Sequence, residues 1–323
     1  MADSVPRVSI VMPVFNEAAL LPATLDSVRR QSLTDFECVV VDDGSTDATP
    51  QILAEYAAQD ARFRIVTQPN GGISNALNAG LAAARGDWIA RLDGDDLMLP
   101  NRLERQLAFA AAEPGLAGCG CDYDIIDMAG RRRGTRHPLP HSREELEKFF
   151  EAGEPLSFTH PTMLFRRDLA LRLGGYRHEC EPAEDVDLFA RMLATGAPIL
   201  IQPETLMQYR IRPGSISGRN AGQQFQMVRF VYHNFYARRA GRAELSQAEF
   251  AALQRQLPLS ARLSASAQAL SDRLYRQYSA SLMTDRPVRA GLCLAAAAAL
   301  RPGKALKRFL RGLTPRPAGR GAI

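Results

Sequence analysis

The first third of the chain alternates short runs of apolar, β-branched residues with segments whose apolar residues recur at helical spacing. Runs that are apolar without alternation are typical of strands buried on both faces, and we expect them at 8–12, 36–41, 63–66 and 88–92. Helices are expected at 18–30, 50–58, 73–84 and 100–112. This order predicts an α/β fold, with a mixed but mostly parallel sheet flanked by helices.

The rest of the chain has a different pattern. Residues 115–218 mix short strands with helices, and we expect them to complete one domain, 1–218, whose first half is 1–114. Strands are expected in that second half at 123–128, 162–165, 198–201 and 206–211. We expect a helical C-terminal extension at 219–313. Residues 314–323 are rich in Pro and Gly, and we expect them to form a disordered tail.

Composition sets the broad class of the protein. Of the 323 residues 46% are hydrophobic and 23% charged, which is typical of a soluble globular enzyme. The five cysteines are odd in number and lack ligand spacing, and the start of the chain lacks the regions of a signal peptide, so a cytoplasmic location is expected. The net charge of +5 suits nucleotides or acidic lipid, and no nucleic-acid partner is expected.

The acidic run Asp93-Gly94-Asp95-Asp96 follows the fourth expected strand. Ligands of open α/β sheets bind beyond the carboxyl ends of the strands, and crowded carboxylates there indicate a cation. Hard divalent cations prefer carboxylate oxygen, so Asp93 and Asp95 are candidate metal ligands. The alternatives are a solvated acidic turn and, for Asp96, a helix cap.

Three further loops lie at the same predicted edge. Asp42 and Asp43 end the second strand ahead of a Gly-Ser-Thr-Asp turn, where a carboxylate could accept the imide N–H of a uracil ring or simply close a tight turn. The loop from Pro13 to Glu17 faces this turn. Asn70-Gly71-Gly72 opens a helix and could present amides to phosphate, although Gly-Gly is more often only a turn.

The second half of the domain contributes two candidates. Glu184 and Asp185 begin an expected helix, where a carboxylate is stabilised by the helix dipole; they are candidates for catalysis or for ordinary capping. His160 is either a pocket residue on the acceptor side or a satisfied core histidine, and the second is the commoner case.

In their order and spacing, the segments 13–17, 42–47, 70–72, 93–96 and 184–185 resemble the family 2 glycosyltransferases. The resemblance covers roughly Val8 to Ser217. It implies a glycosyltransferase A-type fold, with 1–114 as the nucleotide-sugar-binding half and 115–218 as the acceptor half. It also implies an inverting transfer from a nucleotide diphosphate sugar, UDP by preference, with Mg or Mn, as in bacterial enzymes that build capsule or lipopolysaccharide. The Q-x-x-R-W signature of processive relatives is absent, which favours one sugar per encounter.

The resemblance assigns roles by position. Asp43 would meet the base, Asp93 the ribose and Asp95 the metal-bound diphosphate, while Asp185 would be the general base with Glu184 beside it. The donor-binding set would comprise Pro13, Phe15, Glu17, Asp42, Asp43, Asn70, Asp93 and Arg212. Arg212 stands where many relatives carry a histidine. Arginine offers only hydrogen-bond donors, so Arg212 cannot ligate a metal. We expect Arg212, or Arg210, to bind the diphosphate through its positive charge.

Other functions remain open from the residues alone. A metal-dependent nucleotidyl transferase or phosphohydrolase would also place carboxylates at a strand edge, but would leave Glu184 and Asp185 unexplained. A dinucleotide oxidoreductase is disfavoured because no G-x-G-x-x-G follows the first strand. A nucleotide-sugar-binding module without catalysis is a third alternative.

The C-terminal region suggests a further partner. Four basic residues accompany four apolar ones at helical spacing: Lys304, Lys307, Arg308, Arg311, Leu306, Phe309, Leu310 and Leu313. This stretch predicts peripheral contact with the inner face of the plasma membrane, where a glycan or lipid-linked acceptor would meet the site. The alternative is a terminal helix packed on the domain.

Overall fold

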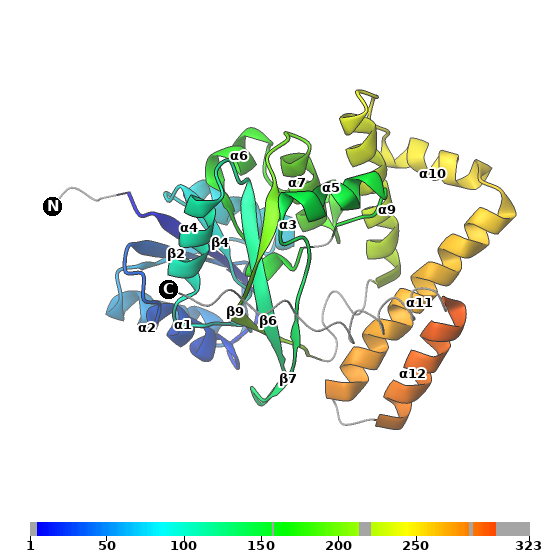
Figure 1. Cartoon of the computed structure of the whole chain (residues 1–323). Helices are drawn as coiled ribbons and strands as arrows, with labels where there is room; N and C mark the ends of the chain where they lie inside the picture. The colour runs from blue at the N-terminus through cyan, green and yellow to red at the C-terminus, as the bar shows by residue number, and fades with distance from the viewer. Residues whose placement is uncertain (1–4, 157, 213–220, 284–286, 302–323) are drawn as a thin grey trace, which may run out of the picture. The chain divides into compact units, whose positions relative to one another are not determined.

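The structure is a computed structural model that describes residues 5–156, 158–212, 221–283 and 287–301 (Figure 1). The chain divides into two compact units. The first comprises Met1–Ile211 and Gln226–Glu244, and the second comprises Arg212–Phe225 and Leu245–Ile323. All of the motifs discussed above except Arg212 and the basic C-terminal stretch belong to the first unit, and that stretch lies outside the described residues.

The first half of the sheet is parallel, as predicted. Its strands are β1 (Val8–Val14), β2 (Phe36–Asp42), β3 (Phe63–Thr67) and β4 (Trp88–Arg91), in the spatial order β3-β2-β1-β4. The chain moves outward from β1 to β3 and then returns to the other side of β1. The carboxyl ends of β1 and β4 therefore mark the switch point at which this class of sheet binds ligands.

Strand β1 is longer than predicted, because Pro13 does not end it. The pairing of β1 with β4 stops at Val11, whose carbonyl accepts from the Leu92 N–H. In a strand, the backbone N–H and C=O groups of alternate residues point to the same neighbouring strand. The backbone of Pro13 therefore points toward β4, as that of Val11 does, but it lies beyond the last residue pair between β1 and β4. The missing N–H of Pro13 therefore removes no hydrogen bond, and β1 continues beside β2 to Val14.

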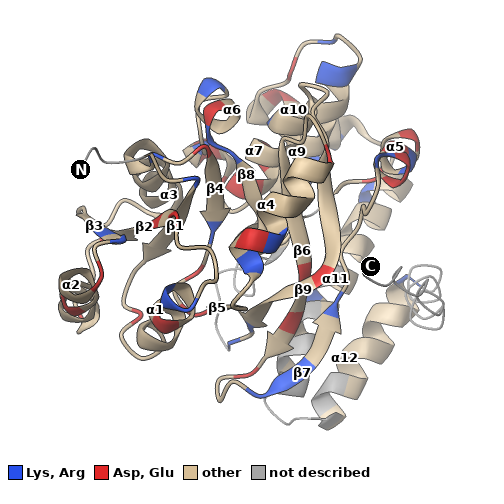
Figure 2. Cartoon of the chain, turned by 60° about the vertical axis from the view of Figure 1, so that its left-hand side comes forward, with Lys and Arg blue, Asp and Glu red and all other residues tan. Residues whose placement is uncertain are grey.

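The second half of the sheet is mixed. Strand β8 (Leu164–Arg166) lies antiparallel between β4 and β6 (Gly118–Ile126), and β6 is parallel to β9 (Ile199–Arg210). The short β5 (Leu97–Met98) pairs with β9, and β7 (Arg132–Arg136) pairs with β6. Figure 2 shows basic residues along β7 beside acidic ones on its neighbour, and an ion pair of 2.8 Å joins Arg132 to Asp124.

The two strands expected at 198–201 and 206–211 are one strand in the structure. Between them the pairing of β9 with β6 slips, from Cys121 opposite Gln202 to Asp122 opposite Thr205. Pro203 lies in this irregularity and is exposed. A bulge accommodates a proline without ending the strand, so the two expected strands are continuous.

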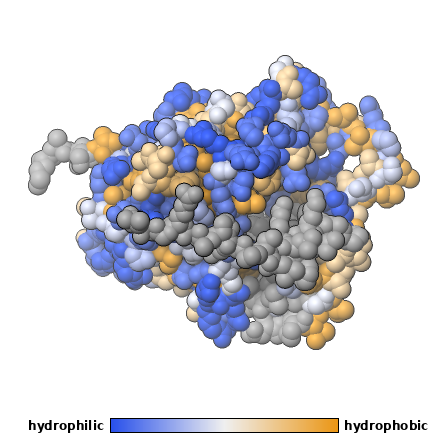
Figure 3. Space-filling model, viewed as in Figure 1, coloured by the Kyte–Doolittle hydropathy of each residue, from blue (hydrophilic) through white to orange (hydrophobic). Residues whose placement is uncertain are grey.

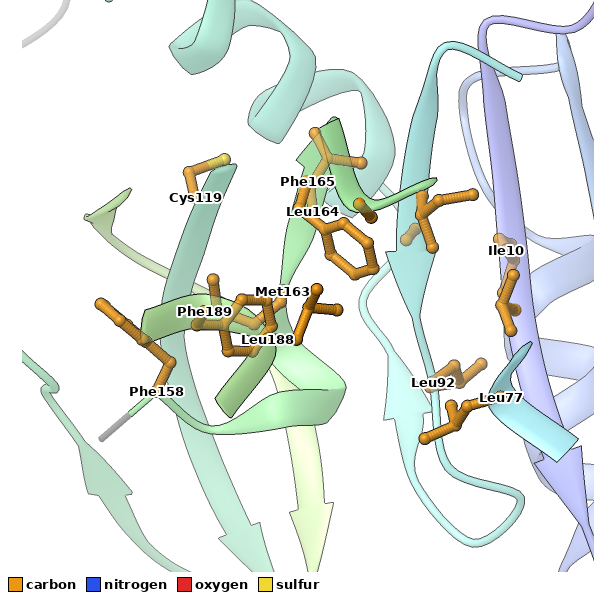
Figure 4. Packing of buried hydrophobic residues seen from close by; sticks show 14 of the residues in the cluster. Ile10, Leu77, Leu92, Cys119, Phe158, Met163, Leu164, Phe165, Leu188 and Phe189 are labelled. Carbon is orange, nitrogen blue, oxygen red and sulfur yellow. The ribbon is translucent and has the colours of Figure 1, made fainter. Parts of the chain in front are cut away.

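Helices cover both faces of the sheet in the first unit (Figure 1). They are α1 (Leu21–Arg29), α2 (Thr49–Gln59), α3 (Ile73–Ala83), α4 (Arg102–Ala112), α5 (Arg143–Glu151), α6 (Arg167–Arg172) and α7 (Glu184–Leu193), with single 3-10 turns at His160–Thr162 and His178–Cys180. The buried core runs through the whole unit; Figure 4 shows Phe165 and Phe189 within it. Helix α9 (Ala221–Arg239) adds Tyr232 and Phe235 to the same core.

The second unit contains α10 (Gln247–Gln256), α11 (Leu259–Met283) and α12 (Pro287–Leu300), with α11 and α12 packed together. Several of its large apolar side chains are exposed, including Leu259, Val288 and Leu292, and Figure 3 shows apolar surface over α12. Among the described helices, none combines the length and the apolar character that crossing a bilayer requires.

The contact of α3 with the sheet yields a stability prediction. A Cβ added at Gly80 would lie 2.5 Å from Val11 Cγ1 and 3.2 Å from Val41 Cγ2, so the helix must move outward to accept it. We expect Gly80→Ala to lower the free energy of unfolding by about 1–3 kcal/mol, measured by urea denaturation. Gly291→Ala in α12, where a Cβ meets nothing within 4 Å, is the control and should not destabilise. Equal effects of the two changes would contradict close packing at Gly80.

Candidate functional site

The loops that follow β1 and β2 are joined by hydrogen bonds. Asn16, whose positive φ of 55° turns the first loop, accepts from the Thr46 N–H at 2.8 Å, and its own N–H donates to Ser45 Oγ at 2.9 Å. The Glu17 N–H donates to Thr49 Oγ1 at 2.9 Å. The first loop therefore faces the second, as the sequence suggested.

Three residues of the first loop were expected to bind the donor, and they differ in exposure. Pro13 is buried in β1, Glu17 is half-buried, and Phe15 is 46% exposed. An exposed aromatic ring at a sheet's binding edge is free to stack on a planar group.

The two strand-end carboxylates after β2 have different surroundings. Asp42 is buried and accepts from the Ser45 N–H at 2.9 Å, which closes a tight turn. Asp43 accepts from Gln68 Nε2 at 2.7 Å and from the N–H groups of Gly71 and Gly72 at 2.9 and 3.0 Å. The amides that the sequence offered to a phosphate are therefore bonded to Asp43, and the Asn70 loop is a turn held by this carboxylate.

The acidic loop after β4 lies directly against the first loop. A Cβ at Gly94 would lie 2.9 Å from Val14 Cγ1 and 3.4 Å from Glu17 Cγ, so only glycine allows this approach. Thr24 Oγ1 in α1 donates to the Gly94 carbonyl at 3.0 Å. Asp93 and Asp95, on either side of Gly94, remain partly accessible. The loops after β1, β2 and β4 thus form one edge.

Arg91, the last residue of β4, is a buried cation that sequence reasoning missed. Its residue is only 2% exposed, and its Nη2 lies 2.6 Å from Asp93 Oδ1. Arg102 in α4, with no exposed surface, donates in turn to the Arg91 carbonyl at 3.1 Å. A basic residue that ends a buried strand immediately before an acidic run was the available signal.

Arg210 holds the acidic loop from the other side. Its Nε donates to the Asp95 carbonyl at 2.8 Å, and its Nη1 donates to the Asp127 carbonyl at 2.7 Å. The guanidinium is buried and bonded to backbone oxygens, so Arg210 positions the loop instead of offering its charge to a ligand. Arg212 follows β9 and is half-buried.

Asp96 is the most enclosed carboxylate of the loop. Its Oδ1 accepts from the Arg210 N–H at 2.7 Å, whereas its Oδ2 is buried without a hydrogen-bond partner. Burial raises the pKa of Asp96 well above its ordinary value, and the charges of Asp93 and Asp95 add to the rise. Asp96 thus supports the loop structurally and does not cap α4.

Glu184 and Asp185 form the first turn of α7. Burial raises the pKa of Asp185 to about 6; the charge of Arg91 opposes this rise, and that of Asp93 adds to it. Burial and the neighbouring Asp185 raise the pKa of Glu184 to about 8, and Glu184 Oε2 is buried without a partner. The start of α7 therefore shares one electrostatic environment with Arg91 and Asp93, which lie more than ninety residues earlier in the chain.

His160 lies in the core beside this site. Its Nε2 is 2.9 Å from the Tyr176 hydroxyl, and its ring packs on Phe189 with centroids 5.8 Å apart. Burial, followed by the charge of Arg91, lowers the pKa of His160 well below its usual value. The residue is a neutral, satisfied core histidine, which was the commoner of the two cases considered.

Two side chains that the sequence did not single out hold the segment before α7. Asn78 in α3 exchanges hydrogen bonds of 2.8 Å with the backbone of Tyr176. Glu181 accepts from the Ser74 N–H at 3.0 Å, at the first turn of α3. These contacts tie α7 to the helix that follows the Asn70 turn. No sequence signal would have found them, because their partners are about one hundred residues away.

The acidic edge offers few ligands to a metal by itself. In the part of the chain that the structure describes, no three His, Cys, Asp or Glu side chains form a metal-ligand group. Asp93 already pairs with Arg91 through one oxygen. Within the described ranges, Asp93 and Asp95 are a pair of partly accessible carboxylates at this edge.

Comparison with known proteins identifies the family. The family model described as Glycosyl transferase family 2 matches residues 9–174, which is half of the chain. The chain belongs to glycosyl transferase family 2. That match contains the loops after β1, β2 and β4 and ends before α7, so the acidic edge is part of the family's common core.

Several curated relatives of this family 2 chain are bacterial proteins. The Bacillus subtilis proteins EpsJ, an uncharacterized glycosyltransferase, and EpsH, a putative one, are 32% and 31% identical to it, over 66% and 70% of this chain. The matches span 63% of EpsJ and 67% of EpsH. The amylovoran biosynthesis glycosyltransferase AmsE of Erwinia amylovora is 31% identical, over 64% of this chain and 76% of AmsE.

Solved structures confirm the fold expected for family 2. S. aureus TarS 1–349 in complex with UDP superposes with a TM-score of 0.56 at 16% identity, over 96% of this chain and 93% of that one. The mannosyltransferase PcManGT of Pyrobaculum calidifontis, in complex with GDP-Man and Mn²⁺, superposes with a TM-score of 0.55 at 20% identity. That match covers 96% of this chain and 80% of PcManGT. The predicted glycosyltransferase A-type fold is confirmed.

The raised pKa of Glu184 predicts a pH-dependent stability. The folded protein keeps a proton between pH 4.5 and about 8 that the unfolded chain releases, so the wild type loses stability as the pH rises through this window. Glu184→Gln has no such proton and should gain free energy of unfolding relative to the wild type from pH 5 to pH 8. Urea denaturation at both pH values measures this, with the exposed Glu55→Gln as control. A difference that does not change with pH would refute the buried, protonated state of Glu184.

Proposed function

We propose that the chain transfers a sugar from a nucleotide diphosphate donor, a UDP-sugar by preference, to an acceptor hydroxyl in bacterial glycan or polysaccharide biosynthesis, with inversion at the anomeric carbon. Family membership supports the reaction class. The relative AmsE is named for the biosynthesis of amylovoran, and the structural neighbours are titled as complexes with UDP, UDP-GlcNAc and GDP-Man. Those titles support a nucleotide-sugar donor.

The donor would lie over the carboxyl ends of β1, β2 and β4. Asp43 is held rigidly by two backbone amides and a glutamine, and a carboxylate has lone pairs left to accept an imide N–H. Phe15 supplies an exposed ring in the first loop, and Pro13, Glu17, Asp42 and Asn70 complete the loops.

Asp95 and Asp93 would hold a divalent cation, Mg or Mn. Both offer the hard oxygen ligands these ions prefer, and a pair of carboxylates fits an ion whose other ligands are phosphate oxygens and water. PcManGT is titled as a complex with Mn²⁺. When bound, the cation would neutralise charge on the leaving diphosphate. Asp95 would be the direct ligand, and Asp93, whose Oδ1 pairs with Arg91, would lie beside it.

Asp185 would take the proton of the acceptor hydroxyl as its oxygen attacks the anomeric carbon. A general base works best when its pKa lies near the working pH yet leaves it ionised, and a pKa of about 6 meets this requirement. Glu184, with a pKa of about 8, is protonated at neutral pH. It therefore cannot accept a proton there, and it would not act as a second base. The observation that carries the proposal is the match to the family model, which contains the loops after β1, β2 and β4.

The acceptor would be a glycan or a lipid-linked glycan reached from the cytoplasm. The basic amphipathic stretch at 304–313 would rest on the inner face of the plasma membrane. Exposed apolar side chains on α12, such as Val288 and Leu292, lie shortly before this stretch in the chain and support such a contact.

The proposed reaction is tested with labelled UDP- and GDP-hexoses, with and without Mn²⁺ or Mg²⁺, and with Asp185→Asn. We expect metal-dependent turnover by the wild type that falls as the pH drops below about 6, because the base is then protonated. Asp185→Asn should lower kcat at least about 100-fold while nucleotide affinity is retained.

The matched control is Asp168→Asn, the same change at an exposed position on α6. It should leave turnover unchanged. Near-normal turnover by Asp185→Asn would require another base, and no turnover of any nucleotide sugar by the wild type would refute the proposed function.

Metal ligation by Asp95 makes a separate prediction. Calorimetric titration of the wild type with UDP should give tighter binding with Mn²⁺ than without, and Asp95→Ala should remove most of that difference, because it removes a ligand of the bridging ion. Asp87→Ala, at the opposite end of β4 and exposed, is the control. If Mn²⁺ strengthens UDP binding equally in Asp95→Ala, the cation is held elsewhere.

A further inference from the structure

Tyr123 on β6 and Tyr209 on β9 form an aromatic pair that the proposed reaction does not use. Their ring centroids are 5.7 Å apart, with an interplanar angle of 62°, so the edge of one ring meets the face of the other. Both residues are only half-buried, whereas Phe165 and Phe189 in the neighbouring core are fully enclosed. The pair therefore keeps some solvent-accessible surface.

The register of β5 and β9 places Tyr209 beside the acidic loop. Leu97 pairs with Gln208 in antiparallel fashion, so one further step sets Tyr209 opposite Asp96. The next residue, Arg210, bonds Asp96 Oδ1 through its N–H. Burial raises the pKa of Tyr209 well above its usual value, and the charges of Asp96, Asp93 and Asp95 add to the rise, as this placement requires.

The two hydroxyl groups have capacity left for a ligand. Tyr123 Oη accepts from Thr159 Oγ1 at 3.1 Å, so the proton of Tyr123 is available to a further acceptor. No hydrogen bond joins the Tyr209 hydroxyl to another residue of the described chain. A half-buried tyrosine normally finds a partner for its hydroxyl, so this group is suited to bind one from outside.

We propose that Tyr123 and Tyr209 form a subsite for a sugar ring of the acceptor. A sugar ring has an apolar C–H face and a rim of hydroxyls, which match an aromatic face and a phenol hydroxyl. The pair lies on β6 and β9, away from the donor loops after β1 and β2, yet beside the carboxylates where the sugar would be transferred. This inference rests on the proposed function and specifies the acceptor as a glycoside.

A purely structural role predicts different behaviour. If the pair only held β9 against β6, its loss would displace Arg210 and the Asp95 loop that Arg210 holds, and donor handling would suffer. A subsite for the acceptor leaves donor handling intact. Hydrolysis of the donor, in which water replaces the acceptor, separates these two cases.

The experiment measures donor hydrolysis and transfer to a panel of p-nitrophenyl hexosides, in the wild type and in Tyr209→Ala, Tyr209→Phe and Tyr123→Ala. We expect each alanine variant to raise the KM for the glycoside by about tenfold or more, with donor KM and donor hydrolysis unchanged. Tyr209→Phe keeps the ring and should show the smaller effect of the hydroxyl. Tyr56→Ala removes a tyrosine from a similar edge-on pair with Phe63, 5.9 Å away on the β3 side, and is the matched control.

Each outcome decides the matter. An unchanged glycoside KM in the folded variants, or hydrolysis that falls together with transfer, would overturn the subsite. Donor hydrolysis by the wild type without transfer to any glycoside, and without glycoside binding by saturation-transfer NMR in the presence of UDP, would overturn the subsite alone. Failure of the wild type to hydrolyse or transfer any donor would remove the proposed function and the subsite with it. Should an alanine variant not fold, Tyr209→Phe carries the test.

Discussion

The ion pair between the buried Arg91 and the partly accessible Asp93 is the interaction on which the acidic edge depends. A cation enclosed to this degree is costly unless it is paired, and its carboxylate partner lies only two residues further along the chain. The same charge opposes the rise of the pKa values of Asp96, Glu184 and Asp185. Without Arg91, burial and mutual repulsion would hold more of these groups protonated, and the proposed cation binding and proton abstraction would lose the ionised oxygens that they require.

The geometry around this pair is rigid because loops distant in sequence bond to one another. Asn16 joins the first loop to the second, and Gly94 lets the acidic loop lie against Glu17. Arg210 closes the arrangement from β9 through two backbone carbonyls. Side chains held in this way lose little further freedom when a ligand arrives, which is the physical basis of preorganisation.

Sequence reasoning predicted most of this scaffold but few of its internal contacts. The four parallel strands follow from local apolar runs, and the acidic loops follow from strand ends, so both were predictable from neighbouring residues. The partners of Asp43, the role of Arg210 and the pairing of Tyr123 with Tyr209 depend on which strands become neighbours. β9 pairs with both β5 and β6 across roughly a hundred residues, and no local pattern encodes that. Pro13 and Pro203 show the same limit, since only the pairing of their strands decides whether a proline ends one.

Two adjacent carboxylates at the start of α7 show how that long-range environment decides chemistry. Glu184 and Asp185 share one helix terminus, so the helix dipole favours the ionised form of both and cannot separate them. Burial separates the pKa values of the two carboxyl groups. Glu184 has an enclosed oxygen without a partner, whereas Asp185 accepts from the Val186 N–H at 2.8 Å. The proton therefore remains on Glu184, and a neutral neighbour spares Asp185 the repulsion of a second charge. Environments that push the pKa values of paired acids apart assign their roles, and here they leave Asp185 as the ionised member.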